Sequence, residues 1–249
     1  MNGPPLGQLR SAISGYIFPR RHTALLVAIV AAFAVRPLIG DLGIAPVIFS
    51  IALIGLMLVS LYTIQVDELV GERERLLAQK KRQSVIGWLL AIAAIGERLA
   101  ITVVPRPSVI LAGVMFWFLF FGYVTWSELR AVLRQKEVTA ETISMSISTY
   151  LLMGLTWGVF YIALYHLQPG AFSFGGSTPG APSEHEIFAI LVYFSLTTLS
   201  TIGFGDITPI TLQARYAAVA EGITGQFYLA ILVARLVGLY MSRTTRHDA

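Results

Sequence analysis

The chain has 249 residues, of which 55% are hydrophobic and only 13% are charged. Soluble domains carry about a quarter charged residues, so this composition excludes an ordinary soluble protein and predicts a chain that lies in a lipid bilayer. The absence of cysteine excludes a disulfide framework or a thiolate metal site. The net charge of +4 does not indicate nucleic acid as a partner, because the basic residues fall in short stretches between apolar segments.

The first half of the sequence predicts four membrane helices behind a polar arm. Residues 1–22 contain several glycines and prolines and are predicted to form a cytoplasmic N-terminal arm. Residues 23–126 are predicted to form a four-helix membrane domain. Its four apolar runs are each long enough to cross the hydrocarbon core and lie at about 23–39, 44–66, 85–104 and 109–126.

The charges of this half bear on voltage sensing. No arginine or lysine lies between Val109 and Trp126, although the four runs have the layout of a voltage-sensor domain. A charge crossing the membrane field contributes about 2.3 kcal/mol per 100 mV, so an uncharged fourth helix cannot supply that work. We interpret Glu97 and Arg98 in the third run as structural, with a small gating role as the alternative. The charged stretch 67–84 is interpreted as a solvated connector, with a partner-docking helix as the alternative.

A connector and a fifth apolar run open the second half. Residues 127–141 place leucine and valine at helical spacing against arginine and lysine, which predicts a helix in the cytoplasmic interface of the membrane. We expect a separate domain over 142–242, which begins with an outer membrane helix at about 142–166. The stretch 168–183 is rich in glycine, proline and serine and is predicted to be a loop outside the membrane.

A short apolar helix is predicted after this loop. Ser183 and Glu186 match a capping box, which favours a helix over 184–200. This helix is too short to cross the bilayer, and glycines follow it directly, as in a re-entrant segment. The last apolar run, 212–241, is predicted to be the inner membrane helix.

The stretch 201–206 reads Thr-Ile-Gly-Phe-Gly-Asp. Glycine at every second position weakens a strand but permits unusual dihedral angles, with which successive carbonyl groups can point the same way. This hexapeptide resembles the selectivity filter of potassium channels, and the second half of the chain is similar to the potassium channel pore superfamily. The resemblance implies that K⁺ is bound by the backbone carbonyls of the filter and by one threonine hydroxyl. The implied ion-binding residues are Thr201, Ile202, Gly203, Phe204 and Gly205, with K⁺ held at the first four of them.

The resemblance also implies a fold and an assembly. The expected fold is an all-α integral membrane protein with six transmembrane helices, a re-entrant pore helix and a filter loop. One chain supplies one loop, so a complete filter requires a homotetramer. K⁺ is then the transported ion, and no organic cofactor is expected. Membrane lipid surrounds the expected assembly, and an unidentified regulatory protein or ligand stays open as a further partner.

Several residues around the hexapeptide are predicted to support the filter. They are Asp206, Tyr193, Phe194, Thr197, Thr198, Ser200 and Glu221. Phe204 replaces the tyrosine that is usual in the family, and Tyr193 and Phe194 stand where many relatives have tryptophan. Thr197 stands where some relatives have glutamate. Because each change removes a polar tether, we expect the conductive state of this filter to be loosely held.

The inner helix carries three residues that need an interpretation. Gly225 aligns with the hinge glycine of simple bacterial potassium channels, and close packing against a neighbouring helix is an equal alternative. Glu221 is expected to be buried and hydrogen-bonded, with a cavity-facing role as the alternative. Its partners are then expected among the pore-helix hydroxyls of Thr197, Thr198 and Ser200. Arg235 is expected to point away from the ion path and to reach the interface or an acid such as Glu128 or Glu137.

The basic residues predict an orientation. With a cytoplasmic N-terminus and six crossing helices, most of the 18 lysines and arginines lie on the cytoplasmic side, and only Arg36, Arg106 and Arg215 lie outside. Residues 243–249 then form a short cytoplasmic tail. We therefore expect a multi-pass protein of the cell inner (plasma) membrane with both termini in the cytoplasm.

The sequence thus predicts passive K⁺ conduction that is not gated by a charged fourth helix. A weakly selective monovalent cation channel is the nearest alternative. A secondary transporter, or a membrane receptor with a vestigial pore loop, is a further alternative, although transporters often contain paired broken helices. An enzyme is not expected, because the four histidines lie at or beyond the predicted membrane ends.

Overall fold

The computed structural model describes residues 21–39, 45–70, 107–175 and 184–247, and these are mostly helical. The described helices are α2 (Arg21–Ile39), α3 (Ala45–Val70), α5 (Pro107–Arg134), α6 (Ala140–Leu167), α7 (Glu184–Leu199) and α8 (Leu212–His247). Two short strands lie between the last three helices: β1 (Phe172–Phe174) precedes α7, and β2 (Ile207–Pro209) precedes α8. The predicted third membrane run at 85–104, with Glu97 and Arg98, lies outside the described residues, as do most of the charged connector and the capping serine at 183.

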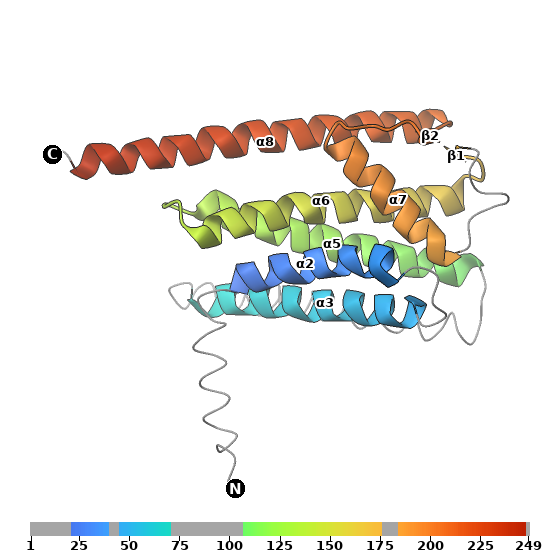
Figure 1. Ribbon diagram of the computed structural model, residues 1–249, viewed down its shortest axis with the longest axis horizontal. Helices are drawn as coiled ribbons and strands as arrows, with labels where there is room; N and C mark the ends of the chain where they lie inside the picture. Colours follow the sequence, from blue (N-terminus) through green and yellow to red (C-terminus); the bar gives the residue numbers. More distant parts are fainter. Residues whose placement is uncertain (1–20, 40–44, 71–106, 176–183, 248–249) are drawn as a thin grey trace, which may run out of the picture.

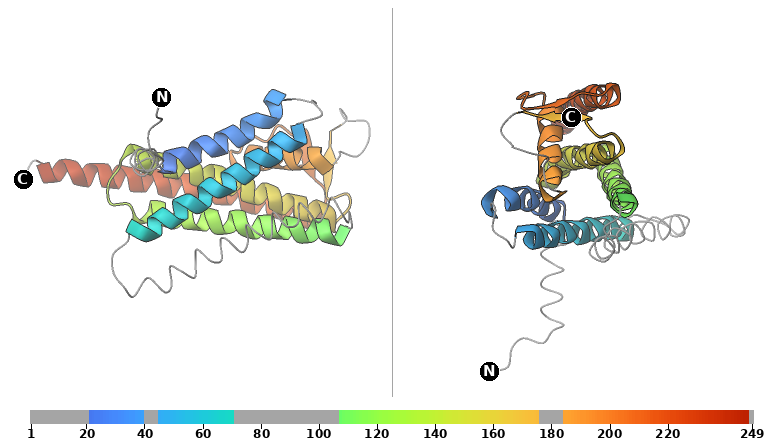
Figure 2. Two further views of the ribbon diagram at one scale, coloured as in Figure 1. Left: turned by 90° about the horizontal axis from the view of Figure 1, so that it is seen from below. Right: turned by 90° about the vertical axis from the view of Figure 1, so that its right-hand side faces the viewer.

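The long helices run side by side along one axis of the molecule (Figure 1). Helix α6 lies at the centre of the packing and contacts α2, α5, α7 and α8. Viewed end-on, α8 lies at one margin of the molecule, away from α2 and α3 (Figure 2). Helix α8 therefore leaves most of its surface uncovered within a single chain.

An apolar core fills the space between α2, α3, α5 and α6. Its fully buried members include Leu25, Ile29, Leu56, Phe120, Phe121 and Leu152. Trp117 and Phe121 stack with ring centroids 5.5 Å apart. Because lipid tails are as apolar as these side chains, such helices associate mainly through close van der Waals packing and not through the hydrophobic effect.

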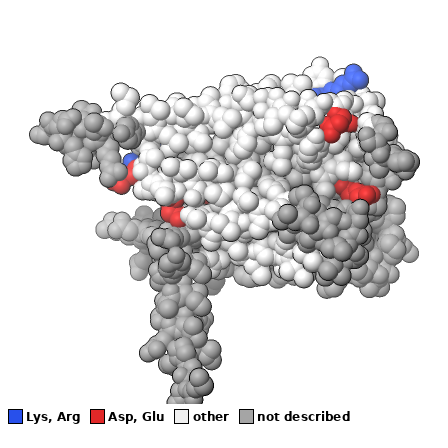
Figure 3. Space-filling model, in the orientation of Figure 1, with Lys and Arg blue, Asp and Glu red and all other residues white. Residues whose placement is uncertain are grey.

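Three described helices are long and apolar enough to cross a membrane. They span Ser108–Arg134, Ala140–Leu167 and Leu212–Leu239, and shorter apolar helices cover His22–Ala34, Ile51–Thr63 and Glu186–Leu199. On the face drawn in Figure 3, the charged side chains that are described lie towards the two ends, and an uncharged band separates them. Length, composition and charge placement together make this chain a membrane protein.

Helix α5 differs from the prediction of a separate connector helix from residue 127. It continues without a break from the fourth apolar run to Arg134. No glycine or proline interrupts residues 123–134, so nothing in that sequence stops the helix. The chain turns only between 135 and 139, where Thr139 caps α6: its hydroxyl accepts a hydrogen bond from the backbone N–H of Thr142, at 3.2 Å.

A two-stranded antiparallel ribbon is the one described element that the all-α prediction did not contain. Phe172 pairs with Pro209, Ser173 with Thr208 and Phe174 with Ile207. The backbone N–H of Ile210 donates to the carbonyl of Ala171 at 2.8 Å and extends this pairing. The ribbon therefore ties the chain before α7 to the chain before α8.

Candidate functional site

Helix α7 runs inward from one end of the molecule, and the chain that follows it returns to the same end. It begins near the end that carries the ribbon and reaches α8 at Gly225, after which the chain runs back to β2 (Figure 1). Helix α7 ends at Leu199, one residue before the predicted end of the pore helix. Its entry and return on one side make α7 and residues 200–206 a re-entrant element.

The C-terminus of α7 closes with a Schellman pattern of hydrogen bonds. The N–H of Ile202 donates to the carbonyl of Thr197 at 2.9 Å, and the N–H of Thr201 donates to that of Thr198 at 3.0 Å. Thr201 takes the left-handed position of this motif, with φ of 60°. Glycine usually occupies this position, and a β-branched residue is strained there. Strained backbone of this kind marks Thr201 as a candidate functional residue.

Left-handed backbone recurs at every second residue of the loop. Thr201, Gly203 and Gly205 have φ values of 60°, 53° and 79°, and no other described residue between 171 and 247 has a positive φ. Such alternation is the backbone pattern with which successive carbonyl groups can line one side of a loop. Carbonyl oxygens arranged in this way can replace the hydration shell of a cation.

The loop is incomplete within one chain. All of residues 201–206 are exposed, and the side chains of Ile202 and Phe204 are 58% and 68% exposed. Unpaired backbone groups at membrane depth must be buried in protein or line a water-filled path. One chain therefore supplies one wall of a site that other surfaces must complete.

The C-terminal end of the loop is fixed to the ribbon. The N–H of Gly175 donates to the carbonyl of Asp206 at 2.6 Å. A methyl group on Gly175 would lie 2.7 Å from that carbonyl oxygen, which is too close for any side chain. The ribbon and this glycine thus fix the position of Asp206, the last residue of the loop.

Two aromatic residues of α7 support the loop in different ways. Tyr193 stacks on Phe204 with ring centroids 6.2 Å apart and ring planes 1° from parallel. The Tyr193 phenol lies close enough to the Asp206 carboxylate for the two groups to interact. Phe194 points to the other side, where it is buried against Tyr161 and Phe172. Tyr193 therefore packs α7 against the loop, whereas Phe194 packs α7 against α6 and β1.

Glu221 of α8 is fully buried behind α7. Its carboxyl group accepts hydrogen bonds from the Tyr161 hydroxyl at 2.7 Å and from the Ser195 hydroxyl at 2.5 Å. The Ser195 oxygen also lies 2.7 Å from the carbonyl of Gly154. This cluster joins α6, α7 and α8 at the level of the re-entrant helix.

The buried position of Glu221 matches its structural interpretation, but its partners differ from the predicted ones. The Thr197 hydroxyl donates to the carbonyl of Phe194 at 2.9 Å, and the Ser200 hydroxyl donates to that of Leu196 at 2.6 Å. Thr198 is half-buried and supplies its carbonyl to the cap of α7. Which hydroxyl of α7 meets α8 depends on the rotation of α7 about its axis, and that rotation brings Ser195 to Glu221.

Glycines allow close contact of α7 with both neighbouring helices. A methyl group on Gly154 of α6 would lie 2.6 Å from the side chain of Leu196. A methyl group on Gly158 would lie 2.8 Å from the side chain of Val192. The two glycines are four residues apart, which is the small-residue spacing typical of packed membrane helices. That spacing is visible in the sequence and could have predicted this interface. Gly225 of α8 is also in close contact with α7, which supports the packing interpretation, while its role as a hinge stays a prediction.

Arg235 does not pair with Glu128 or Glu137 as predicted. Its guanidinium donates from Nη2 to the backbone carbonyls of Leu133 at 2.5 Å and Gln135 at 2.8 Å. The last carbonyls of a helix have no partner within that helix, and Arg235 satisfies two of them at the end of α5. Glu128 instead contacts Nδ1 of His22 at 3.2 Å.

A helix that enters and returns through an open loop, between two helices long enough to span the bilayer, defines the pore module of a membrane ion channel. The family model described as an ion channel matches residues 149–242. Potassium channel protein kcv of Paramecium bursaria Chlorella virus 1 is 33% identical over 72 residues, which are 29% of this chain and 76% of that protein. The chain therefore belongs to the potassium channel pore superfamily, whose members are ion channels and not enzymes.

Other relatives match over similar lengths. Two pore potassium channel c of Oryza sativa subsp. japonica is 39% identical over 88 residues, which are 35% of this chain and 16% of that protein. Protein LctB of Bacillus caldotenax is 28% identical over 103 residues, which are 41% of this chain and 74% of that protein. The chain thus matches less than a fifth of the rice protein. No solved structure matches the chain.

Proposed function

We propose that this chain is a subunit of a potassium-selective channel that conducts K⁺ passively across the cell membrane. The observation that carries the proposal is the alternation of left-handed backbone at Thr201, Gly203 and Gly205, directly after a re-entrant helix. The names of the relatives from the virus and from rice, both potassium channels, support K⁺ as the permeant ion.

In this proposal the loop coordinates dehydrated K⁺. The ligands are the backbone carbonyls of Thr201, Ile202, Gly203 and Phe204 together with the Thr201 hydroxyl. Several adjacent sites let an entering ion displace those ahead of it, so binding does not trap the ion. The C-terminus of α7 carries partial negative charge and ends beside Gly225 of α8, where it favours a cation in a water-filled cavity.

We further propose that four copies surround the ion path. Each chain contributes one loop, and the exposed side chains of Ile202 and Phe204 then pack against the neighbouring copy. Helix α8 also has a long uncovered apolar face, on which Tyr216, Val219, Ile223 and Phe227 are each at least half exposed. Contact between copies would cover part of this face, and lipid would cover the rest.

The proposed topology has six membrane helices and cytoplasmic termini. Arg130, Arg134 and Lys136 lie at one end of the long helices, and the loop and Arg215 lie at the other. Positive charge marks the cytoplasmic end, so the loop opens towards the outside. Under this topology residues 23–126 form the outer four-helix domain and residues 142–242 the pore domain.

We propose that opening does not use voltage sensing by α5. Between Ser108 and Ser127 this helix has no charged residue, and Trp117, Phe120 and Phe121 fix it in the core. An uncharged and well-packed helix has nothing on which the membrane field can act. The described residues place no stimulus-binding domain beside the pore.

A weakly selective monovalent cation channel is the second candidate. It is favoured by Phe204, which has no hydroxyl group to tie the loop to α7 and is held only by stacking on Tyr193 within one chain. A loosely held loop discriminates less well between ions of different size. The two candidates predict different flux ratios for K⁺ and Na⁺.

Flux into vesicles tests the proposal. The full chain is reconstituted, and uptake of K⁺ and of Na⁺ is followed under the same applied potential. We expect uptake of K⁺ well above that of Na⁺, and we expect Thr201→Gly to reduce this preference while it relieves the strained backbone. Equal uptake of both ions would favour the second candidate, and the absence of uptake in correctly folded protein would contradict a channel. Thr208→Gly in the exposed part of β2 is the control for loss of a threonine.

A further inference from the structure

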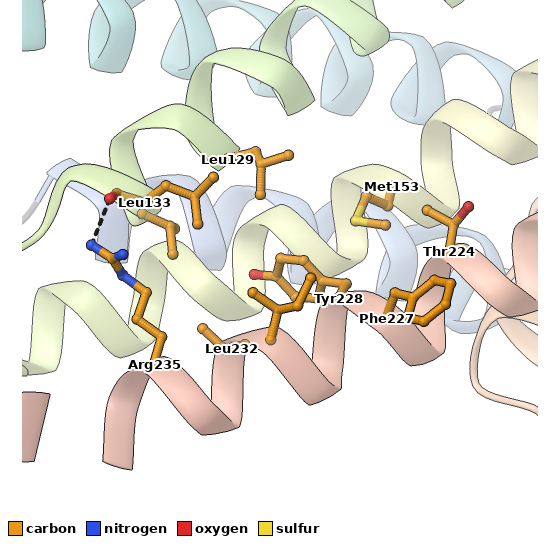
Figure 4. A pocket seen from close by; sticks show the side chains of 10 residues that line it. Leu129, Leu133, Met153, Thr224, Phe227, Tyr228, Leu232 and Arg235 are labelled. Carbon is orange, nitrogen blue, oxygen red and sulfur yellow. Dashed lines mark hydrogen bonds between the residues drawn. The ribbon is translucent and has the colours of Figure 1, made fainter. Parts of the chain in front are cut away.

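A cavity lies between the end of α5, α6 and the middle of α8, away from the filter loop. Its volume is about 320 Å³, within the range of small-molecule pockets. The lining is almost entirely apolar and includes Leu129, Leu133, Met153, Phe227, Leu232 and Arg235. Figure 4 shows Arg235 at one end of the cavity beside Leu133, with Thr224 and Phe227 at the other end.

Arg235 adds a positive charge to this apolar lining, together with an N–H group that has no hydrogen-bond acceptor in the described part of the chain. Its Nη2 atom is occupied by the carbonyls of Leu133 and Gln135, but its Nε atom is buried and has no hydrogen-bond partner among the described residues. A buried N–H without an acceptor is unfavourable and rare in folded proteins. The arginine end of the cavity therefore lacks a hydrogen-bond acceptor, and an anionic one fits the charge best.

The length of the cavity matches one leaflet of a membrane. From Thr224 to Arg235, α8 advances by 11 residues, which is about 16 Å at 1.5 Å per residue. Half of a hydrocarbon core of about 30 Å is about 15 Å. An acyl chain that follows α8 in one leaflet would thus place its headgroup at Arg235.

Other residues at this end are typical of headgroup depth. The guanidinium of Arg130 lies over the ring of Trp126, 4.8 Å from its centroid. Tryptophan is enriched at the membrane interface, and basic side chains there attract anionic lipid. Arg134 and Lys136 are exposed at the same end of α5.

We propose that this cavity binds an anionic phospholipid, with one acyl chain along α8 and the phosphate at Arg235. The lipid lies between the end of α5 and the inner helix, where its phosphate meets the charge of the Arg235 guanidinium. This lipid is bound at a specific site between the two helices and is distinct from the bulk lipid of the bilayer. The site does not depend on ion conduction, so binding and conduction can be tested separately.

Photolabelling of the full chain tests this site. Purified protein in detergent is exposed to phosphatidylglycerol that carries a diazirine in one acyl chain, and labelled peptides are identified. We expect label on Met153 and on residues 227–232, and we expect unlabelled phosphatidylglycerol to compete about tenfold better than phosphatidylcholine with the same acyl chains. Arg235→Gln should weaken competition by phosphatidylglycerol to the level of phosphatidylcholine, whereas Arg134→Gln should leave it unchanged.

Several outcomes would overturn the proposal. They are equal competition by the two lipids, equal effects of Arg235→Gln and Arg134→Gln, or label spread over α3 and α5 without enrichment at Met153. A neighbouring copy that fills the cavity would also leave Met153 unlabelled. The lipid competition uses the unaltered chain, so it decides the question even if Arg235→Gln fails to fold. Leu232→Trp, which fills the cavity and keeps the charge, should reduce labelling by both lipids.

Discussion

A methyl group placed on Gly225 would lie 2.6 Å from the carbonyl oxygen of Leu199, the last residue of α7. The inner helix thus touches the backbone of the re-entrant helix directly, two residues before the left-handed Thr201. The same carbonyl accepts a hydrogen bond from the Tyr150 hydroxyl of α6 at 3.2 Å. The end of α7 is therefore held from two sides, and a movement of α8 at Gly225 acts directly on the start of the filter loop.

Gly225→Ala should displace the end of α7, because neither backbone has room for the added methyl group. Overpacking of this kind costs about 1–3 kcal/mol. We expect a lower thermal unfolding temperature in detergent and a reduced K⁺ current in planar bilayers. Gly238→Ala is the matched control, since a methyl group on Gly238 of the same helix meets no atom within 4 Å. Equal behaviour of the two variants would contradict the contact.

Substitutions of Glu221 should separate its hydrogen bonds from its charge. In Glu221→Gln the amide oxygen can accept from Tyr161 and the amide nitrogen can donate to Ser195, whose own proton then goes to the carbonyl of Gly154. We expect this variant to be as stable as the parent. Glu221→Leu leaves the buried Tyr161 hydroxyl without its acceptor, which costs about 1–3 kcal/mol. Thermal unfolding of both variants measures the difference, and a Leu variant as stable as the parent would contradict a structural role for the cluster.

The loop and the Tyr193 side chain should be linked functionally. Tyr193→Phe keeps the stack on Phe204 but removes the hydroxyl group that interacts with Asp206. We expect K⁺ current to decay faster during sustained opening, because the outer end of the loop loses a tether. Phe204→Tyr adds a hydroxyl group and should slow the decay. Tyr216→Phe on the exposed face of α8 is the control, and unchanged decay in both loop variants would rule out a loosely held filter.

The start of α2 should contribute to stability through buried polar contacts. His22 and Glu128 are 3% and 2% exposed, and the Thr23 hydroxyl donates to Glu141 at 2.7 Å. These contacts join α2 to the end of α5 and to the start of α6. His22→Leu removes one partner of the buried Glu128 and should lower the free energy of unfolding by about 1–3 kcal/mol. Lys136→Gln, exposed at the same end, should have no measurable effect in the same thermal unfolding assay.

Length and composition were sufficient to predict the described membrane helices. A run such as 212–241 has to be helical in a bilayer, since only a helix satisfies its backbone groups within the segment. An irregular loop at 201–206 was also predicted, because alternating glycines weaken a strand and permit the left-handed backbone that Gly203 and Gly205 adopt. The ribbon was missed, since strands of three residues show no usable periodicity.

Contacts between helices were predicted less well than the helices themselves. Ser195 and Tyr161 were not expected at Glu221, because the choice among the hydroxyls of α7 depends on the rotation of that helix. Arg235 was expected at the interface or at an acid, and its partners are two backbone carbonyls at the end of α5, which a sequence does not mark. Such partners are set by tertiary packing and not by local residue pattern.

The reversal potential of single channels tests the central claim most directly. The full chain is placed in a planar bilayer with K⁺ on the cytoplasmic side and Na⁺ at equal concentration on the other side. If the carbonyl-lined loop selects K⁺ by more than tenfold, the current should reverse more than about 59 mV negative of zero, since each tenfold ratio shifts a one-charge potential by about that amount. A reversal near 0 mV would contradict selective conduction of K⁺ through this loop.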